Sequence, residues 1–317
     1  MMLAAPVALS RLNQLEVALN SAIRGKPEVV RLSMVCMLAH GHLLIEDVPG
    51  VGKTTLAQAM ARSVHCRFHR LQCTSDMLPS DVLGVTIYNA HTQEFEFKQG
   101  PIFTNFLLAD EINRATPKTQ SALLEAMNEM QVTIESHSYA LEQPFMVMAT
   151  QNPVEHHGTY PLPESQLDRF LMRLRIGYPD REAEREIVRN ADGIHGENIR
   201  AVISAEEVLQ LQEQVSRVSV DDALVNYMLT IVEKTRTHES LALGVSPRAA
   251  QALFRATQAL ALVEGRDYVI PDDVKRLVIP VFAHRVAVSA RASLAQRSTE
   301  LSERILQEIL TLVEVPL

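Results

Sequence analysis

Two groups of residues in this chain have the types and spacing needed to bind and cleave a phosphate anhydride. The first is the glycine-rich stretch of residues 46–55, which lies between an apolar run and a run with helical character. In a strand–turn–helix arrangement, backbone N–H groups of the turn and of the helix N-terminus point towards a bound anion. The residues expected to contact the phosphates are Val48, Pro49, Gly50, Val51, Gly52, Lys53, Thr54 and Thr55.

Two side chains of this loop have specific chemistry. We expect Lys53 to reach the β- and γ-phosphates of a nucleotide, and the hydroxyl of Thr54 to bind Mg²⁺. Asp47 occupies the position at which such loops usually have their first glycine, whereas the residues nearest the phosphates are intact. A plain glycine turn before a helix is the alternative interpretation, and the adjacent lysine and threonine argue against it.

The second group is a pair of carboxylates, Asp110 and Glu111, directly after the apolar residues 106–109. Ligands of an open α/β sheet bind at the carboxyl ends of its strands. We therefore expect Asp110 to lie beside Thr54 and hold Mg²⁺, usually through water, and Glu111 to polarise the water that attacks the γ-phosphate. An isolated acidic pair after a strand is most often a surface turn. After a phosphate loop, it predicts the second half of a nucleotide hydrolysis site.

The elements that position these residues alternate between strands and helices. Helices are expected at residues 53–64, 78–83, 118–130 and 164–169, after two N-terminal helices. Such alternation predicts a parallel sheet covered by helices on both faces. The five strands are expected at residues 42–46, 67–72, 106–109, 145–150 and 171–176.

Two segments interrupt this alternation. Residues 85–98 and 132–141 each contain two short runs with period-two alternation joined by polar residues, which predicts two inserted β-hairpins. After Tyr178-Pro-Asp180, the strand signal ends and helical patterns continue to the C-terminus, with start signals at Ser204 and Ser246. The sequence thus predicts an α/β domain over residues 1–180 and a smaller all-α domain over residues 181–317.

Composition limits the class of protein. The 317 residues are 47% hydrophobic and 21% charged, with a net charge of −8 and no run of lysines and arginines. Nucleic-acid binding is therefore not expected. No apolar run approaches the ~20 residues needed to cross a bilayer, so membrane insertion is not expected either. The three cysteines form no C-x-x-C pair, which suits a reducing compartment. We expect a cytoplasmic protein.

Taken together, these motifs resemble those of the AAA+ ATPases, and most closely the MoxR family within them. The resemblance spans nearly the whole chain and implies an α/β P-loop core with a parallel five-stranded sheet and inserted hairpins, followed by a helical lid. The segments that carry it are Asp47-Val-Pro-Gly-Val-Gly-Lys-Thr54, Asp76-Met-Leu-Pro-Ser-Asp-Val-Leu-Gly84, Gly100-Pro-Ile-Phe103, Asp110-Glu-Ile-Asn-Arg-Ala115, Ala149-Thr-Gln-Asn-Pro153, Leu167-Asp-Arg-Phe170 and Gly244-Val-Ser-Pro-Arg248.

The resemblance implies roles for three further residues. Asn152 would orient the attacking water as the first sensor, from a strand lying between the two strands that bear the phosphate loop and the acid pair. Arg248 would reach back to the γ-phosphate as the second sensor. Arg169 would be an arginine finger donated to the nucleotide of a neighbouring subunit. The alternatives are a structural asparagine, a helix-surface arginine and an ion pair of Arg169 with Asp168 or Glu164, respectively.

The resemblance also implies an activity and partners. The reaction would be ATP + water → ADP + phosphate with Mg²⁺ as cofactor, and the base would lie near Gly25-Lys26 and the lid. The chain would form a homo-oligomeric ring, a hexamer, and remodel a client protein together with a separate von Willebrand factor A-domain protein. The alternatives are a magnesium chelatase-like motor subunit, a nucleic-acid-associated AAA+ motor, and a nucleotide-binding regulator without hydrolysis, against which the complete catalytic set argues.

Overall fold

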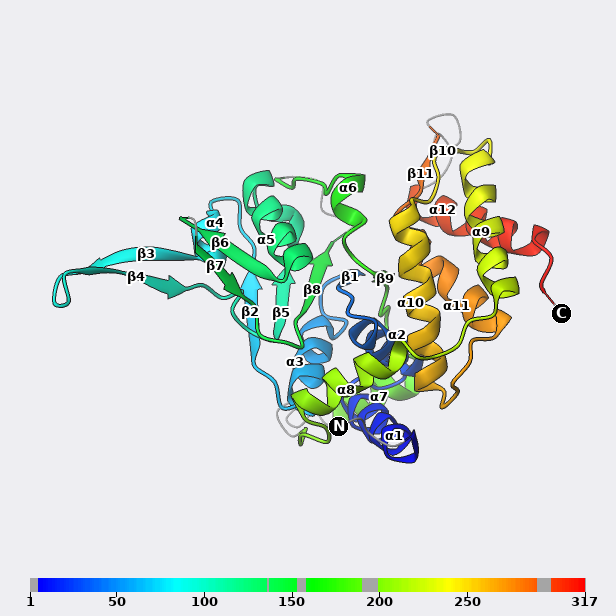
Figure 1. Ribbon diagram of the computed structural model, residues 1–317, viewed down its shortest axis with the longest axis horizontal. Helices are drawn as coiled ribbons and strands as arrows, with labels where there is room; N and C mark the ends of the chain where they lie inside the picture. The colour runs from blue at the N-terminus through cyan, green and yellow to red at the C-terminus, as the bar shows by residue number, and fades with distance from the viewer. Residues whose placement is uncertain (1–4, 136, 153–157, 190–198, 290–297, 317) are drawn as a thin grey trace.

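The computed structural model describes residues 5–135, 137–152, 158–189, 199–289 and 298–316. Five strands form a parallel sheet in the order β2–β5–β8–β1–β9 (Figure 1). This confirms the predicted sheet, and β8 lies between β5 and β1 as the resemblance implied. The strands are β1 (Leu43–Glu46), β2 (Phe68–Gln72), β5 (Phe106–Asp110), β8 (Met146–Gln151) and β9 (Met172–Leu174).

Helices cover both faces of this sheet. On one face lie α1 (Ala5–Ala22), α2 (Pro27–Leu38) and α3 (Lys53–Ser63), and on the other lie α4 (Pro79–Leu83) and α5 (Pro117–Glu129). Proline at the first turn and a capping side chain explain where α5 begins, since the hydroxyl of Thr116 accepts a hydrogen bond from the backbone N–H of Thr119. The single-turn η1 (Ile112–Arg114) and α6 (Glu164–Leu167) complete the α/β part.

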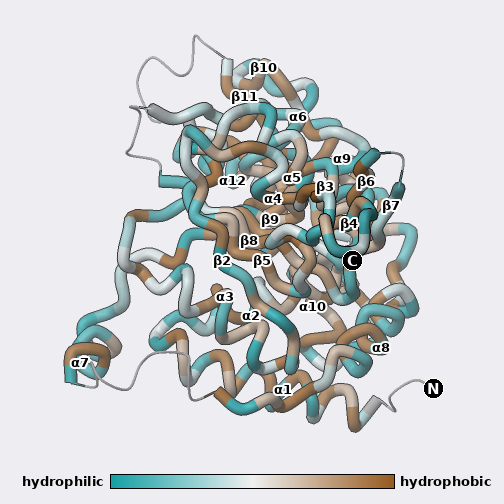
Figure 2. The backbone as a smooth tube through the Cα atoms, turned by 90° about the vertical axis from the view of Figure 1, so that its left-hand side faces the viewer, coloured by the Kyte–Doolittle hydropathy of each residue, from teal (hydrophilic) through white to brown (hydrophobic). Residues whose placement is uncertain are grey.

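Two hydrophobic cores lie on the two faces of the sheet because successive strand residues point in opposite directions. Leu43 and Ile45 of β1 belong to the core that contains α1, α2 and α3, whereas Leu44 belongs to the core that contains α4 and α5. Figure 2 shows hydrophobic residues along the central strands and hydrophilic ones along many outer loops. The first core continues into the C-terminal helices without a break.

Both predicted hairpins are present in the structure. The first pairs β3 (Gly84–Asn89) with β4 (Glu94–Gln99), and the second pairs β6 (Gln131–Ile134) with β7 (His137–Ala140). The β3–β4 hairpin extends away from the body of the molecule, on the side opposite the C-terminal helices (Figure 1). The β6–β7 hairpin lies closer to the sheet, where Tyr139 stacks on Phe97 of β4 with ring centroids 4.3 Å apart.

The C-terminal region is helical, as predicted. It contains α7 (Arg181–Arg189), α8 (Ala205–Val215), α9 (Asp222–Thr237), α10 (Pro247–Val263), α11 (Pro271–Phe282) and α12 (Ser298–Leu312). The predicted capping box is confirmed, because Ser204 Oγ accepts the Glu207 N–H and Glu207 accepts the Ser204 N–H. A short antiparallel ribbon of β10 (Leu241–Leu243) and β11 (Ala287–Val288) adds to this region, and its strands are too short to produce a recognisable period. The domain boundary near residue 180 stays a prediction.

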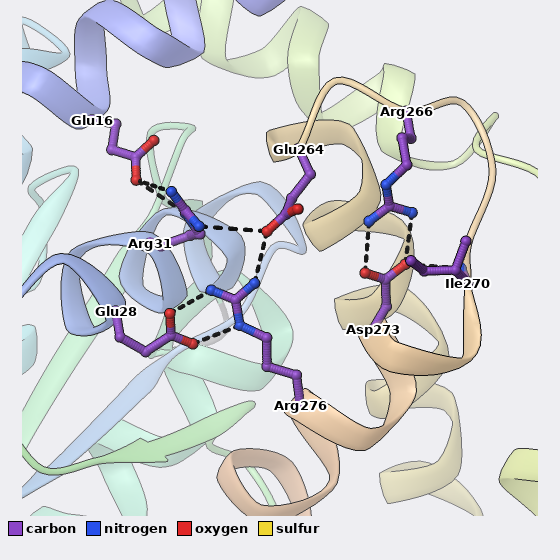
Figure 3. Close-up of polar contacts among 8 residues, drawn as sticks. All are labelled: Glu16, Glu28, Arg31, Glu264, Arg266, Ile270, Asp273 and Arg276. Atoms are coloured by element: carbon purple, nitrogen blue, oxygen red, sulfur yellow. Dashed lines mark hydrogen bonds and ion pairs between the residues drawn. The ribbon is translucent and has the colours of Figure 1, made fainter.

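Ion pairs at the surface join the C-terminal helices to the N-terminal ones (Figure 3). Arg276 of α11 donates to Glu28 at the start of α2 and to Glu264 at the end of α10. Arg31 of α2 donates to Glu16 of α1 at 2.7 Å and also contacts Glu264. The hydrogen bond to Glu28 and the surrounding carboxylates raise the pKa of Arg276. This network fixes α11 and α10 against the helices of the α/β part.

None of the helices in the described part of the chain combines the length and the apolar character needed to cross a lipid bilayer.

Candidate active site

The phosphate loop connects β1 to α3 through two glycines in the left-handed region. Gly50 has φ 85° and Gly52 has φ 95°, a conformation in which a side chain is strained. Gly52 is the N-cap of α3, and its carbonyl accepts the N–H of Leu56 to begin the helix. The first-turn N–H groups of α3 therefore open towards the loop, which suits an anion. Lys53 begins the helix, and its Nζ donates to the backbone oxygen of Asp47 at 2.9 Å.

Asp47, at the position of the usual first glycine, has a structural role. Its side chain is 8% exposed and accepts two backbone hydrogen bonds, from the N–H of Val48 at 2.9 Å and from the N–H of Gly177 at 2.6 Å. Because Gly177 follows β9, the carboxylate ties the start of the phosphate loop to the end of the adjacent strand. The departure from the motif is therefore compatible with an intact loop.

The acid pair lies at the carboxyl end of β5, as predicted. Oδ1 of Asp110 accepts a hydrogen bond from the hydroxyl of Thr150 at 2.6 Å, and Oδ2 accepts one from Arg70 at 2.6 Å. Thr150 Oγ1 also accepts the backbone N–H of Glu111 at 2.9 Å. One buried hydroxyl on β8 thus orients both acidic residues, which turn sharply apart because Glu111 has φ 56°. Strained backbone of this kind occurs at functional sites.

The carboxylate of Glu111 has two further partners. It accepts a hydrogen bond from Gln72 at 2.8 Å and forms an ion pair with Arg114 at 3.1 Å. A cavity of about 380 Å³ brings together the phosphate loop, the acid pair and Asn152. Its lining residues are Pro49, Gly50, Gly52, Lys53, Thr54, Thr55, Arg70, Gln72, Asp110, Glu111 and Asn152.

A second cavity of about 370 Å³ adjoins the first and shares Gly50, Gly52 and Thr55 with it. Its apolar lining residues include Ile23, Ile176, and Ile187 and Val188 of α7. Lys26, which precedes α2, also lines it, together with the charged residues Arg24 and Glu184. A flat, apolar base attached to the phosphates would fit this adjoining space.

Arg169 and Arg248 do not lie in either of these cavities. They line a third cavity of about 570 Å³ together with Arg255 of α10 and Arg285. Arg169 donates to the backbone oxygen of Leu124 at 2.8 Å. Among the described residues, no carboxylate pairs with Arg169, Arg248 or Arg255. The cavity therefore presents several positive charges to solvent, a feature that suits an anion.

The role of Arg248 as the second sensor stays a prediction, and the structure gives its position. The residue does not reach back to the phosphate loop of its own chain, because α10 packs on α2 and α11 and places its first turn beside the end of α5. There Arg248 donates to Asn128 at 2.5 Å. The ion pair of Arg169 with Asp168, considered as an alternative to a finger, is also not formed, since Asp168 pairs with Arg285.

The two histidines beside this cavity carry no charge at neutral pH. Burial lowers the pKa of His42 to about 4, and the positive charge of Arg248 acts in the same direction. His42 Nδ1 accepts the Val147 N–H, so Nε2 carries the proton and donates to Met127 O. Burial and the charge of Arg255 lower the pKa of His40. The arginines alone supply the positive charge of the cavity.

Comparison with known proteins agrees with this geometry. Residues 42–172 match the family model of the "ATPase family associated with various cellular activities (AAA)", and residues 233–309 match that of the AAA lid domain. The chain is 43% identical to Chaperone MoxR1 of Mycobacterium tuberculosis, over 90% of this chain and 78% of that protein. It is 30% identical to protein MoxR of Paracoccus denitrificans, over 88% of this chain and 89% of that one.

The chain belongs to the MoxR family of AAA+ ATPases.

Two more similar proteins match this chain over almost its full length. The uncharacterized protein YeaC of Bacillus subtilis is 50% identical over 94% of this chain and 92% of its own. A crystal structure of a Cytophaga hutchinsonii protein classed as an ATPase has a TM-score of 0.90 and 36% identity, and covers 99% of this chain and 97% of its own. This MoxR-family chain therefore has the fold of a nucleotide-binding AAA+ ATPase, a class of ATP-hydrolysing enzymes.

Several residues at the site were not identified from the sequence. Arg70 and Gln72 lie two residues apart on β2, so both point to the same face and reach the acid pair on β5, where Gln72 pairs in register with Asp110. Their polar character at the carboxyl end of a strand was the available signal. Thr150 precedes Asn152 by two residues and offered the same signal. The roles of Arg255 and Arg285 had no local signal.

Proposed function

We propose that the protein hydrolyses ATP to ADP and phosphate in the cavity between the phosphate loop and the acid pair. The observation that carries this proposal is the convergence of Lys53, Thr54, Asp110, Glu111 and Asn152 on one cavity from separate segments of the chain. Lys53 would hold the β- and γ-phosphates and Asn152 would orient the attacking water. Glu111, whose carboxylate is positioned by its backbone bond to Thr150, would accept the proton of that water.

Magnesium fits the donor set of this cavity. Thr54 and Asp110 offer a hydroxyl and a carboxylate oxygen, the hard donors that Mg²⁺ prefers, and both line the same cavity. The ion would neutralise negative charge on the phosphates when bound. Asp110 Oδ2 accepts two hydrogen bonds from the guanidinium of Arg70. One oxygen of this carboxylate therefore already has a positively charged partner. The adjoining apolar cavity would take the adenine.

The test of this proposal is the substitution Glu111→Gln. It preserves the size of the side chain and leaves Asp110 intact, but removes the proton acceptor. ATP affinity should remain, while turnover falls by about 100-fold or more. Glu125→Gln on the exposed face of α5 makes the same chemical change outside the cavity and should leave turnover at the wild-type rate. Wild-type turnover by the Glu111→Gln protein would exclude Glu111 from the mechanism.

Lys53→Ala tests binding separately from turnover. It removes the cation from the phosphate loop, and titration should then show ATP affinity reduced by about tenfold or more, because hydrogen bonds to charged groups contribute roughly 1.5–3 kcal/mol. Lys118→Ala, in the first turn of α5 and away from the cavity, is the matched control. Equal ATP affinity in both variants would contradict the assignment of the phosphate loop.

We also propose that the chain works as a ring of identical subunits, with six as the expected number. Arg169 and Arg248 lie in a cavity that contains none of the phosphate-loop residues, so they are available to the nucleotide of an adjacent copy rather than to their own. A cation donated across a subunit interface stabilises the charge on the transferred phosphoryl group, and it makes hydrolysis depend on assembly.

Mixing two inactive variants tests this assembly. Arg169→Ala protein should bind ATP but hydrolyse it slowly, and so should Glu111→Gln protein. Mixed rings contain interfaces where an intact Arg169 meets an intact Glu111, and these should recover part of the activity. Absence of any recovery, with both variants still assembling, would contradict a finger acting between subunits.

The family also supports a proposal for what the energy of ATP hydrolysis does. We propose that ATP hydrolysis drives remodelling of a client protein, in line with the name of Chaperone MoxR1, and that a separate von Willebrand factor A-domain protein connects the ring to its client. Capture by the Glu111→Gln protein in the presence of ATP should enrich such a protein, and capture by Lys53→Ala protein should not. The cytoplasmic location stays a prediction.

A further inference from the structure

Arg285, which follows α11, is the most completely hydrogen-bonded cation that the described residues contain. Only 5% of it is exposed, and each of its five N–H groups has an acceptor. Nε donates to Asp168 Oδ1 at 2.8 Å. Nη1 donates to the backbone oxygens of Leu171 at 3.1 Å and Val281 at 2.6 Å. Nη2 donates to the backbone oxygens of Asp168 at 3.2 Å and Phe170 at 2.7 Å.

Four of these five acceptors belong to residues 168–171, the segment that carries Arg169. Two other residues of the helical region contact the same segment. The hydroxyl of Ser246, the N-cap of α10, donates to Asp168 Oδ2 at 3.3 Å. Nε2 of His284 donates to the backbone oxygen of Phe170 at 2.9 Å. The backbone on either side of Arg169 is therefore held by the helical region rather than by the sheet alone.

Stability alone does not explain this ion pair, in which the Arg285 side chain is buried and the Asp168 side chain is 23% exposed. Removing the guanidinium from water costs several kcal/mol, and apolar side chains of similar volume are often as stable. Burial lowers the pKa of Arg285 to about 10 and the charge of Asp168 opposes that effect, so the guanidinium remains protonated at neutral pH. The guanidinium does fix geometry, since its planar N–H groups bind three backbone carbonyls of this short segment in defined directions.

We propose that Arg285 is a positioning residue that locks residues 168–171 to the helical region and thereby aims Arg169 at the nucleotide of the neighbouring subunit. The inference rests on the proposed role of Arg169 between subunits. Arg248 lies two residues after Ser246, at the start of α10, so the same set of contacts also holds it beside Arg169. Movement of the helical region would then move both arginines together.

The test is Arg285→Lys, which keeps the positive charge but cannot supply five N–H groups in a plane. Because residue 285 does not line the phosphate cavity, the affinity for ATP and the KM should stay at the wild-type values. The hydrolysis rate should fall about tenfold or more, as expected when a donor to the transition state is misplaced. Addition of Glu111→Gln protein should restore activity, because its subunits offer a correctly held Arg169 to the intact Glu111 site of the Arg285→Lys subunits.

A matched control is available on α11. Arg276→Lys makes the same change in a residue that also joins the helical region to the α/β part, through Glu28 (Figure 3), but does not contact residues 168–171. It should hydrolyse ATP at the wild-type rate. A loss in Arg276→Lys equal to that in Arg285→Lys would overturn the inference, because any weakening of the junction would then suffice.

Recovery of activity in the mixture of Arg169→Ala and Glu111→Gln proteins is the reference against which the mixture of Arg285→Lys and Glu111→Gln proteins is compared. If that mixture recovers activity and the mixture with Arg285→Lys does not, Arg285 does not act through Arg169 and the inference is wrong. If neither mixture recovers, the role of Arg169 between subunits is wrong, and the inference falls with it. Should Arg285→Lys fail to fold by circular dichroism, Asp168→Asn removes the charge of the partner instead and must show the same pattern of loss and recovery.

Discussion

At the scale of single residues, the site depends on side chains that fix the catalytic groups without performing chemistry. Thr150 is fully buried on β8, and its hydroxyl contacts both the carboxylate of Asp110 and the N–H of Glu111. The backbone turns at Glu111, which has a left-handed conformation, so the side chains of Asp110 and Glu111 point in different directions. The contact of both residues with Thr150 fixes these directions. The buried hydroxyl therefore connects the metal-binding and water-activating groups that we propose.

Thr150→Val should uncouple the two acids while preserving the shape of the side chain. It leaves one lone pair of Asp110 and the N–H of Glu111 without a partner, which costs roughly 1.5–3 kcal/mol where a charged group is involved. We expect a fall in turnover of about 10- to 100-fold and weaker dependence of ATP binding on Mg²⁺. Thr150→Ser retains the hydroxyl and should stay close to wild type. Equal turnover in the two variants would contradict this role.

The stability of the protein should depend on pH through the buried side chain of His42. Its pKa is about 4 in the folded protein, against an ordinary value of 6.5, so the unfolded chain binds the additional proton as the pH falls between these values. The contribution of His42 to the free energy of unfolding should fall by roughly 3 kcal/mol across this window, and it should be constant above it. His42→Gln can still donate to Met127 and does not titrate, so denaturant melts at pH 7 and pH 4.5 should show a smaller loss. The same loss in both proteins would refute this assignment.

At the scale of elements, the carboxyl edge of the sheet is built by contacts between neighbouring strands and loops. Asp47 joins the phosphate loop after β1 to the residues after β9, and Thr150 joins β8 to β5. The order β2–β5–β8–β1–β9 is what brings these residues together. The phosphate loop and the acid pair are therefore each held by a strand other than their own.

Asp47→Ala should loosen the phosphate loop. The backbone N–H groups of Val48 and Gly177 would lose a charged acceptor, at a cost of roughly 1–3 kcal/mol in unfolding free energy. We also expect reduced ATP affinity, because Lys53 donates to the backbone of residue 47. Asp47→Asn keeps one acceptor oxygen and should lie between the wild type and Asp47→Ala in chemical denaturation. Unchanged stability in Asp47→Ala would show that water replaces both contacts at no cost.

At the scale of the whole molecule, three working parts lie at separate places. The phosphate cavity is at the carboxyl edge of the sheet, and the arginine-rich cavity is lined by residues from the end of α5, residues 168–171 and α10. The β3–β4 hairpin projects on the side opposite the C-terminal helices (Figure 1). The hairpin exposes aromatic side chains, since Phe95 is 75% exposed and packs edge-on against Tyr88. Exposed aromatic residues on a projecting segment are typical of contacts with another protein.

Shortening the hairpin tip at residues 90–93 tests this separation. ATP binding and basal hydrolysis should be retained, because the tip lies outside both cavities, while stimulation by a client or partner should fall. Tyr88→Ala with Phe95→Ala should reproduce the effect without changing the length of the hairpin. If the hairpin supports neighbouring subunits instead, sedimentation will show loss of the ring before any partner assay shows a defect.

The sequence by itself determined the local features of this protein. Glycines, a lysine and hydroxyls within ten residues specify the phosphate loop because their chemistry is local, and the acid pair follows from an apolar run that ends in two carboxylates. Period-two alternation predicted both hairpins, and alternation of strands and helices predicted the parallel sheet. These patterns need no knowledge of distant contacts, since backbone geometry alone sets the period.

Only the tertiary structure decided where distant residues meet. The packing of α10 on α2 and α11 places Arg248 in the same cavity as Arg169, although the two residues are 79 positions apart in the sequence. Thr150 and Arg70 offered only their polar character near the carboxyl ends of strands, and Arg285, which follows α11, had no local signal. Their partners are 39 to 117 positions away along the chain. The contacts of Thr150 and Arg70 depend on the order of the strands in the sheet, and that of Arg285 depends on how the helical region docks on the sheet. Both are set by the sum of many apolar contacts, which no short stretch of sequence encodes.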